Sequence, residues 1–283
     1  MADTLAGHTL VESSDIGDDA LAEISLILEM HCNFSISVYK DKCMKRRIAI
    51  RMRSCRCLDA SAYCNVLRQN SQELLLLKKA LTIHVSQFFR NPSMFEKLKT
   101  IVLPPLFQST VAEQKQLQFW SLGCAGGEEA YSLGILLHEF FAEDILQSPV
   151  KILASDIDDD ILKTAVEAEY HEDRLKDIPE DIRENYFSHI GSRLQLLPSI
   201  KEMVTFHKQN IMDVDTFEPC EMVLCRNTLI YFTRPDQEKI LRGIAHILPS
   251  GGVLVLGKSE TLVGDVRKLF TTICPLERIY RRV

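Results

Sequence analysis

The sequence predicts an open, mostly parallel α/β sheet that follows a small domain made only of helices. Short apolar runs alternate with helical patterns along the second half of the chain, as in a parallel sheet. Before residue 100, leucines and isoleucines recur at helical spacing and glycine and proline are scarce. A glycine-rich turn between an apolar run and a helix indicates the nucleotide-binding corner of a Rossmann-like sheet.

The composition is that of an ordinary globular protein. Of the 283 residues, 46% are hydrophobic and 25% are charged. A formal net charge of −6 argues against a general nucleic-acid binder. No apolar run reaches the roughly 18 residues of a membrane span, and the polar start lacks the blocks of a signal peptide. We therefore expect a cytoplasmic protein without membrane insertion, and nothing in the sequence implies an oligomer.

The cysteines and histidines do not form a recognisable metal motif. The nine cysteines are scattered and contain no paired CxxC sets, and the eight histidines contain no HExxH. In a reducing cytoplasm such cysteines are ordinarily buried thiols. We predict no metal.

The first part of the chain is expected to be a flexible N-terminus over residues 1–18, then a helical domain over residues 19–105. Helical patterns cover Ala20 to Met30, Ala60 to Leu67 and Gln72 to Thr82. The boundary to the second domain, residues 106–283, is predicted between Pro104 and Gln116.

A basic stretch lies inside the helical domain and contains almost no opposite charge. Its members are Lys40, Lys42, Lys45, Arg46, Arg47, Arg51, Arg53 and Arg56. In an acidic chain this asymmetry favours a docking surface for an acidic partner over a merely solvated helix face. A nucleic acid or an acidic helix of another protein would satisfy the same feature.

The segment from His84 to Pro92 follows, with two phenylalanines as anchors in a core. Arg90 stands between these anchors and Pro92, which restricts the chain. An arginine held rigidly in this way is a candidate for binding a carboxylate through two hydrogen bonds.

The glycine-rich corner begins with a strand predicted over Leu117 to Leu122. Gly123, Gly126 and Gly127 supply a tight turn, and Glu128 opens a helix. A helix N-terminus suits pyrophosphate, but Glu128 and the following Glu129 would repel it and would suit an ammonium or sulfonium group. This favours S-adenosylmethionine over a dinucleotide. The alternative is that the two acids only complement the helix dipole.

Two aspartates follow the next strand, predicted over Val150 to Ser155. An acid at the end of the second strand typically accepts hydrogen bonds from ribose hydroxyls, which indicates Asp156. Asp158 is better placed to cap the following helix.

The remaining elements continue the α/β pattern. Arg193 to Leu197 and Met203 to Lys208 alternate as in a short inserted β hairpin, at about residues 190–208. Phe206 to Asp213 also fits the end of a third sheet strand, where Asn210 could meet an adenine or its ribose. The later predicted elements are strands at Met222 to Cys225, Val253 to Leu256, Phe270 to Ile273 and Glu277 to Arg281, and a helix from Pro235 to Leu248.

Four motifs in order resemble the CheR family, S-adenosylmethionine-dependent methyltransferases that esterify glutamates on bacterial chemoreceptors. They are Ser86 to Arg90 (SQFFR), Gly123 to Ser132 (GCAGGEEAYS), Ser155 to Asp158 (SDID) and Cys225 to Phe232 (CRNTLIYF). The resemblance runs from about residue 20 to the C-terminus. It implies a Rossmann-like class I methyltransferase sheet with a small N-terminal all-helical domain and a short inserted β hairpin.

The resemblance also implies roles for individual residues. S-adenosyl-L-methionine would be held by His84, Ser86, Arg90, Gly123, Glu129, Asp156, Asn210, Ile211 and Asn227. Arg90 and Tyr231 would lie nearest the transferred methyl group. The docking residues for the cytoplasmic methylation helices of chemoreceptors would be Lys45, Arg46, Arg47, Arg51 and Arg53.

The sequence departs from the family pattern at three positions and leaves two other functions open. His84 stands where the family often has asparagine, Ala130 replaces a frequent proline, and Lys258 replaces a histidine. Some members of the family use a longer insert at the hairpin to bind a C-terminal peptide tether of the receptor. The short hairpin here suggests that this chain does not need such a tether. One alternative function is a nucleic-acid methyltransferase, although the paired prolines of adenine-N6 enzymes are absent after Arg226. The other is a non-catalytic S-adenosylmethionine-binding signalling module.

Overall fold

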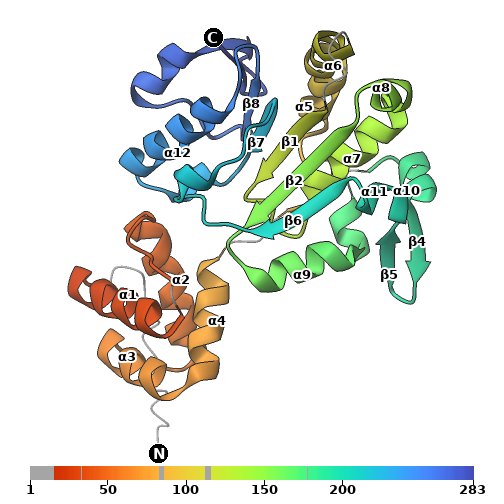
Figure 1. Cartoon of the computed structure of the whole chain (residues 1–283). Helices are drawn as coiled ribbons and strands as arrows, with labels where there is room; N and C mark the ends of the chain where they lie inside the picture. Colours follow the sequence, from red (N-terminus) through yellow and green to blue (C-terminus); the bar gives the residue numbers. More distant parts are fainter. Residues whose placement is uncertain (1–15, 33, 83–85, 112–115, 177) are drawn as a thin grey trace, which may run out of the picture. The chain divides into compact units, whose positions relative to one another are not determined.

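The computed structural model describes residues 16–32, 34–82, 86–111, 116–176 and 178–283 (Figure 1). The chain divides into two units. The helical unit comprises the chain up to Ile83 together with Tyr231–Thr233, and the sheet unit comprises His84–Ile230 and Arg234–Val283. Most of the predicted flexible N-terminus lies outside the described residues. No described helix is long and apolar enough to cross a membrane.

The predicted domain boundary near residue 105 is wrong. The segment after His84 forms α5 (Pro92–Lys97), the π-helical turn η2 (Leu98–Val102) and α6 (Leu103–Val111). Their apolar side chains, among them Phe95 and Leu98, belong to the same buried core as Phe119 of the sheet. A helical sequence pattern does not show which core buries the helix.

The helical unit contains α1 (Asp18–Cys32), α2 (Asp41–Ser54), α3 (Ala60–Gln69) and α4 (Ser71–Leu81). Side-chain caps begin two of them: Asp59 accepts from the Ala62 N–H at 2.8 Å, and Asn70 accepts from the first turn of α4. Each helix directs an apolar stripe inward; the stripes include Ile24, Leu28, Met44, Ile48, Tyr63, Leu67 and Leu77, all buried.

One buried carboxylate joins three of these elements. Glu73 of α4 accepts two hydrogen bonds from Arg51 of α2, at 3.0 and 2.5 Å, and one from the Tyr63 hydroxyl of α3 at 2.7 Å. Burial acts to raise the pKa of Glu73, but the hydrogen bonds from Arg51 and Tyr63 outweigh it and the pKa is lowered. The carboxylate is therefore held ionised between its partners.

The sheet unit is built on seven strands in the order β6-β2-β1-β7-β8-β10-β9. The strands are β1 (Leu117–Leu122), β2 (Val150–Asp156), β6 (Val204–Lys208), β7 (Met222–Cys225), β8 (Val253–Leu256), β9 (Phe270–Cys274) and β10 (Ile279–Arg282). The first five in space are parallel, and β10 runs antiparallel to both neighbours. The strand order reverses at β1, so ligands are expected in the crevice beyond the carboxyl ends of β1 and β7.

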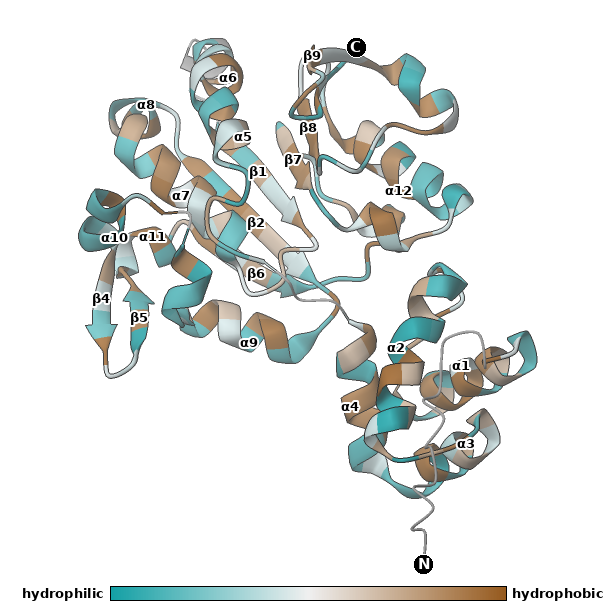
Figure 2. Cartoon of the chain, turned by 180° about the vertical axis from the view of Figure 1, so that it is seen from behind, coloured by the Kyte–Doolittle hydropathy of each residue, from teal (hydrophilic) through white to brown (hydrophobic). Residues whose placement is uncertain are grey.

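Helices cover this sheet, as expected for strands that are apolar throughout (Figures 1 and 2). The main ones are α7 (Glu128–Phe140), α8 (Ala142–Gln147), α9 (Asp159–Glu167) and α12 (Arg234–Ile247). α7 packs on β1 and β2, and α9 packs on β2 and β6. α7 begins after the glycine turn that follows β1, and α9 begins shortly after the end of β2.

A second, three-stranded sheet has the order β3-β5-β4 and corrects the predicted hairpin. The hairpin is formed by β4 (Phe187–Ile190) and β5 (Arg193–Leu196), and β3 (Glu169–Tyr170) pairs with β5. Pro198 opens the short helix α11 (Pro198–Lys201), and the next segment is β6 of the main sheet. Apolar and polar residues alternate in the same way in a hairpin strand and in an edge strand of a larger sheet. The alternation therefore could not show that Val204–Lys208 pairs with β2. The excursion also contains η3 (Glu172–Leu175) and α10 (Glu180–Tyr186).

Candidate cofactor site

The glycine turn lies at the carboxyl end of β1, where the strand order reverses. The N–H groups of Gly123 and Cys124 both donate to the Ser155 carbonyl of β2, at 2.8 and 2.9 Å. Gly123 has φ of 81°, and a Cβ there would lie 2.6 Å from the Thr228 hydroxyl oxygen. Only glycine allows this close approach between the ends of β1 and β7.

Asp156 shapes the same turn from the end of β2. Its carboxylate accepts the Ala125 N–H at 3.0 Å and the Asp158 N–H at 3.1 Å. Ala125 has φ of 48°, an unfavourable conformation for alanine that this hydrogen bond supports. Asp156 is the last residue of β2, the position at which an acid typically binds ribose in such sheets. The ribose role stays a prediction.

The predicted cap is confirmed. Asp158 accepts from the N–H groups of Asp160 at 2.9 Å and Ile161 at 3.4 Å, at the start of α9.

The two glutamates of the first turn of α7 each contact an arginine. Glu129 accepts from Arg226 at 3.0 Å and from the Ser121 hydroxyl at 2.8 Å. Glu128 is buried and lies 3.3 Å from a guanidinium nitrogen of Arg174. The sequence suggested that these acids attract a cationic ligand, but each is already paired with a cation of the chain.

The segment Ser86–Asn91 contains two residues in the left-handed region, Phe89 with φ of 48° and Asn91 with φ of 64°. The Phe89 N–H donates to the Ser132 hydroxyl of α7 at 2.8 Å. The Phe88 ring packs edge-on against Tyr170 and Phe187, with centroids 4.8 and 5.1 Å away. Arg90 is thus carried by a firmly anchored segment. His84 lies outside the described residues.

Asn227 follows β7 and also has a left-handed backbone, with φ of 58°. Its N–H donates to Glu260 at 2.9 Å, and the same carboxylate accepts from Gly257 at 2.6 Å and Ile230 at 3.2 Å. Burial raises the pKa of Glu260, opposed by these backbone hydrogen bonds. The sequence analysis assigned Glu260 no role; its only signal was its place two residues after Lys258, in the segment that follows β8.

Asn210 and Ile211 follow β6, at the same end of the sheet. The Asn210 side-chain oxygen accepts the Met212 N–H at 3.0 Å and closes a turn, and Ile211 is buried. Five of the predicted binding residues, Gly123, Asp156, Asn210, Ile211 and Asn227, thus lie at or just after the carboxyl ends of β1, β2, β6 and β7. Their contact with a cofactor remains a prediction.

Tyr231 belongs to the helical unit. Its carbonyl accepts the Lys40 N–H at 2.8 Å, and Tyr39 and Phe232 form an isolated β-bridge with ring centroids 4.9 Å apart. The geometry of the sheet-unit site is therefore built without Tyr231, and its role near the methyl group stays a prediction.

The predicted docking residues fall into two groups. Lys45 forms an ion pair with Asp18 at 2.6 Å, Arg47 donates to the Ala80 carbonyl at 2.6 Å, and Arg51 binds Glu73. These three stabilise the helical unit. Arg46 and Arg53 are exposed and share one face of α2 with Lys42 and Ile50, because the four lie at helical spacing.

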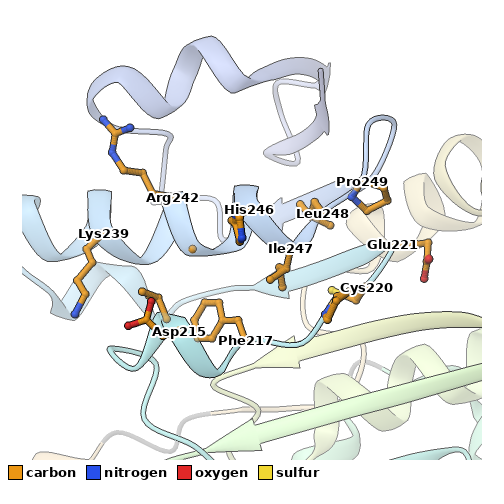
Figure 3. Close-up of a pocket in the computed structure, with 13 residues that line it drawn as sticks. Asp215, Phe217, Cys220, Glu221, Lys239, Arg242, His246, Ile247, Leu248 and Pro249 are labelled. Carbon is orange, nitrogen blue, oxygen red and sulfur yellow. The ribbon is translucent and has the colours of Figure 1, made fainter.

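A cavity of about 790 Å³ lies elsewhere in the sheet unit, along α12 (Figure 3). Phe217, Ile247 and Leu248 contribute its apolar lining, and Lys239 and Asp215 lie at one end. Its walls come from α12 and from the chain on the amino-terminal side of β7. The cavity therefore contains none of the predicted cofactor-binding residues.

The chain's cysteines are all free thiols, and the described residues contain no cluster of three metal-ligating side chains. A glycine turn at the switch point, an acid at the end of the second strand and an antiparallel β10 between β8 and β9 define a class I fold of the S-adenosylmethionine-dependent methyltransferases. The residues present fit that cofactor.

The chain belongs to the CheR methyltransferase family. The family's SAM-binding domain matches residues 84–275, and its all-alpha domain matches residues 19–82. The cofactor is accordingly S-adenosylmethionine, as the sequence suggested. The two matches meet next to residue 83, which is also the boundary between the helical unit and the sheet unit.

Several relatives are similar over most of this chain. The "Uncharacterized 104.1 kDa protein in hypE 3'region" of Rhodobacter capsulatus is 33% identical over 93% of this chain, which spans only 27% of that relative. A "Chemotaxis protein methyltransferase" of Listeria monocytogenes is 29% identical over 84% of this chain and 88% of its own length. One from Borreliella burgdorferi is 29% identical over 89% and 91%.

Proposed function

We propose that this chain transfers the methyl group of S-adenosylmethionine to side-chain carboxylates of glutamates on chemoreceptors, in the cytoplasm. The observation that carries the proposal is the similarity to chemotaxis methyltransferases over nearly the whole of both chains. The family models match the helical unit as well as the cofactor-binding unit. A shared cofactor domain alone would leave the acceptor open.

The chemistry requires little acid–base work from the protein. When bound, the cofactor supplies an electrophilic methyl group on a sulfonium. A glutamate with a pKa of about 4.3 is already ionised at neutral pH, so no general base is required. The role left to the chain is to align the carboxylate with the methyl group and to exclude water, which can lower the barrier by about 7–11 kcal/mol.

Arg90 is the residue to which we assign the acceptor carboxylate. Its segment is fixed through the bond from Phe89 to Ser132 and through the Phe88 ring, so the guanidinium starts from a rigid backbone. A guanidinium stabilises the carboxylate in the ground state as well, so we assign it positioning. To Tyr231 we assign, through its hydroxyl, the acceptor or the methyl group.

The exposed face of α2 is the docking surface in this proposal. Arg46 and Arg53 present positive charge there, and Ile50 between them is 45% exposed. An acidic amphipathic helix, such as the methylation helix of a chemoreceptor, would complement both the charges and the apolar residue.

The decisive test uses methyl-labelled S-adenosylmethionine and a cytoplasmic receptor fragment, followed by alkaline treatment. Release of the label as volatile methanol is expected, because a carboxyl methyl ester hydrolyses in base. Label that resists alkali would indicate methylation of nitrogen and would refute the glutamate assignment. Cofactor binding with no transfer to several receptor fragments would favour a non-catalytic signalling module.

A further inference from the structure

Two glutamate–arginine pairs connect the segment Ser86–Asn91 to the start of α7. In the first pair, Glu128 contacts Arg174 at 3.3 Å, and the same nitrogen of Arg174 donates a short hydrogen bond to the Ser86 carbonyl. The Arg174 carbonyl in turn accepts the Phe88 N–H at 3.0 Å. Arg174 therefore holds the segment through its side chain and its backbone.

The second pair repeats the arrangement at the other end of the segment. Arg226 donates to Glu129 at 3.0 Å, and its other terminal nitrogen donates to the Arg90 carbonyl at 2.8 Å and to the Asn91 side chain at 2.7 Å. Consecutive glutamates of one helix turn are thus linked by two arginines to both ends of a six-residue stretch, Ser86–Asn91.

The segment requires such support because its backbone is unfavourable by itself. Two of its residues, Phe89 and Asn91, have left-handed backbones, which cost free energy and persist only where the surroundings impose them. Arg90 lies between these two residues. A segment that relaxed toward ordinary backbone angles would carry the Arg90 side chain away from its present direction.

We propose that Arg174 and Arg226 are positioning residues, which fix the direction of Arg90 by pinning the two ends of its segment to Glu128 and Glu129. Arg174 comes from η3, which follows β3 of the small sheet, and Tyr170 of β3 donates to the Gly126 carbonyl at 2.7 Å. The small sheet is therefore part of the frame of the site. The expected effect on methyl transfer rests on the proposed function of Arg90. The expected stabilisation of the segment Ser86–Asn91 does not.

Arg174 is the better target for a test. Its side chain is 37% exposed, whereas that of Arg226 is 3% exposed, so replacement of Arg226 would test folding as much as positioning. Arg174→Gln removes the charge, and Arg174→Lys keeps it with fewer donors. Arg193→Gln is the matched control, because Arg193 pairs with Glu169 at 3.8 Å on the same small sheet and lies outside this network.

Two measurements on the full chain require no acceptor. In Arg174→Gln, amide hydrogen exchange over Ser86–Asn91 is expected to accelerate about tenfold or more, as expected for the loss of one charged hydrogen bond. The dissociation constant for S-adenosylhomocysteine is expected to rise by a similar factor. Arg174→Lys should recover part of both effects, and Arg193→Gln should show neither. Unchanged exchange in a folded Arg174→Gln chain would overturn the proposal.

Transfer kinetics test whether Arg174 acts through Arg90. Arg174→Gln is expected to lower kcat in the native background and to have no further effect on kcat in an Arg90→Ala background. Fully additive losses would overturn the positioning role. If the native chain methylates no receptor fragment, the proposed function fails, while the exchange and affinity measurements still decide whether the clamp exists.

Discussion

Replacing Asp156 by alanine gives the sharpest test of the cofactor site. The carboxylate holds the Ala125 and Asp158 N–H groups at 3.0 and 3.1 Å. In our assignment it also accepts two ribose hydroxyls of the cofactor. The substitution therefore removes ligand contacts and loosens the turn beneath the ligand.

The expected loss of affinity follows from the number of hydrogen bonds. A hydrogen bond to a charged group contributes about 1.5 kcal/mol at the low end of its range, so two ribose bonds contribute about 3 kcal/mol. Since each 1.4 kcal/mol is tenfold, the dissociation constant for S-adenosylhomocysteine should rise about 100-fold. Loss of the two backbone contacts adds to this through the turn at Ala125.

Titration calorimetry of the folded variant measures the change directly. The matched control is Asp158→Ala, because Asp158 stands two residues away and caps α9. That control should lose about 1 kcal/mol of stability and keep its cofactor affinity. An Asp156→Ala chain that binds within about threefold of the native value would refute the ribose assignment, and so would an equal loss in the control.

Four further outcomes are expected. Charge reversal of Arg46 and Arg53 to glutamate should lower receptor methylation about tenfold or more at low salt without changing the affinity for S-adenosylhomocysteine; unaltered receptor kinetics would place docking elsewhere. Arg51→Met should instead lower the free energy of unfolding by about 3 kcal/mol in urea, because it leaves the Glu73 carboxylate buried without its cation. Because the pKa of Glu73 is lowered on folding, its carboxylate stabilises the fold at pH values above its ordinary pKa of 4.5, and this contribution is lost as the pH falls through the lowered pKa. The free energies of unfolding of the native chain and of Glu73→Gln should therefore converge in acid. Glu260, whose pKa is raised, should show the opposite pH dependence: its contribution to the free energy of unfolding falls as the pH rises from 4.5 through the raised pKa. Glu260→Gln should lack this pH dependence.

The elements and the ends of strands could be predicted from the sequence because their signals are local. The apolar run, the glycines and the helix start are consecutive residues, and β1 and β8 have the predicted bounds. Asp158 was identified as a cap from its place before a helix, and the structure confirms it. Such features depend on a few neighbouring residues, so periodicity and turn chemistry suffice.

The partners of the site residues could not be predicted, because they lie far apart along the chain. Arg226 reaches Glu129 and Arg90, which are 97 and 136 residues away, and Arg174 reaches Ser86 across 88 residues. The misplaced hairpin and domain boundary have the same origin. A period of two does not identify a strand's partner, and a helical pattern does not show which core buries it.

The pairing of the first-turn glutamates also changes how the site can recognise a cationic ligand. Glu129 alone would attract an ammonium or a sulfonium by its net charge, but with Arg226 at 3.0 Å the pair is neutral. Both of its carboxylate oxygens already accept one bond, from Ser121 and from Arg226. Each carboxylate oxygen can still accept a further hydrogen bond, in a direction that the existing bonds fix. A neutral pair cannot attract cations by net charge. We therefore expect Glu129 to orient an ammonium group by a hydrogen bond, whose direction depends on how rigidly the Arg226 hydrogen bonds hold the carboxylate.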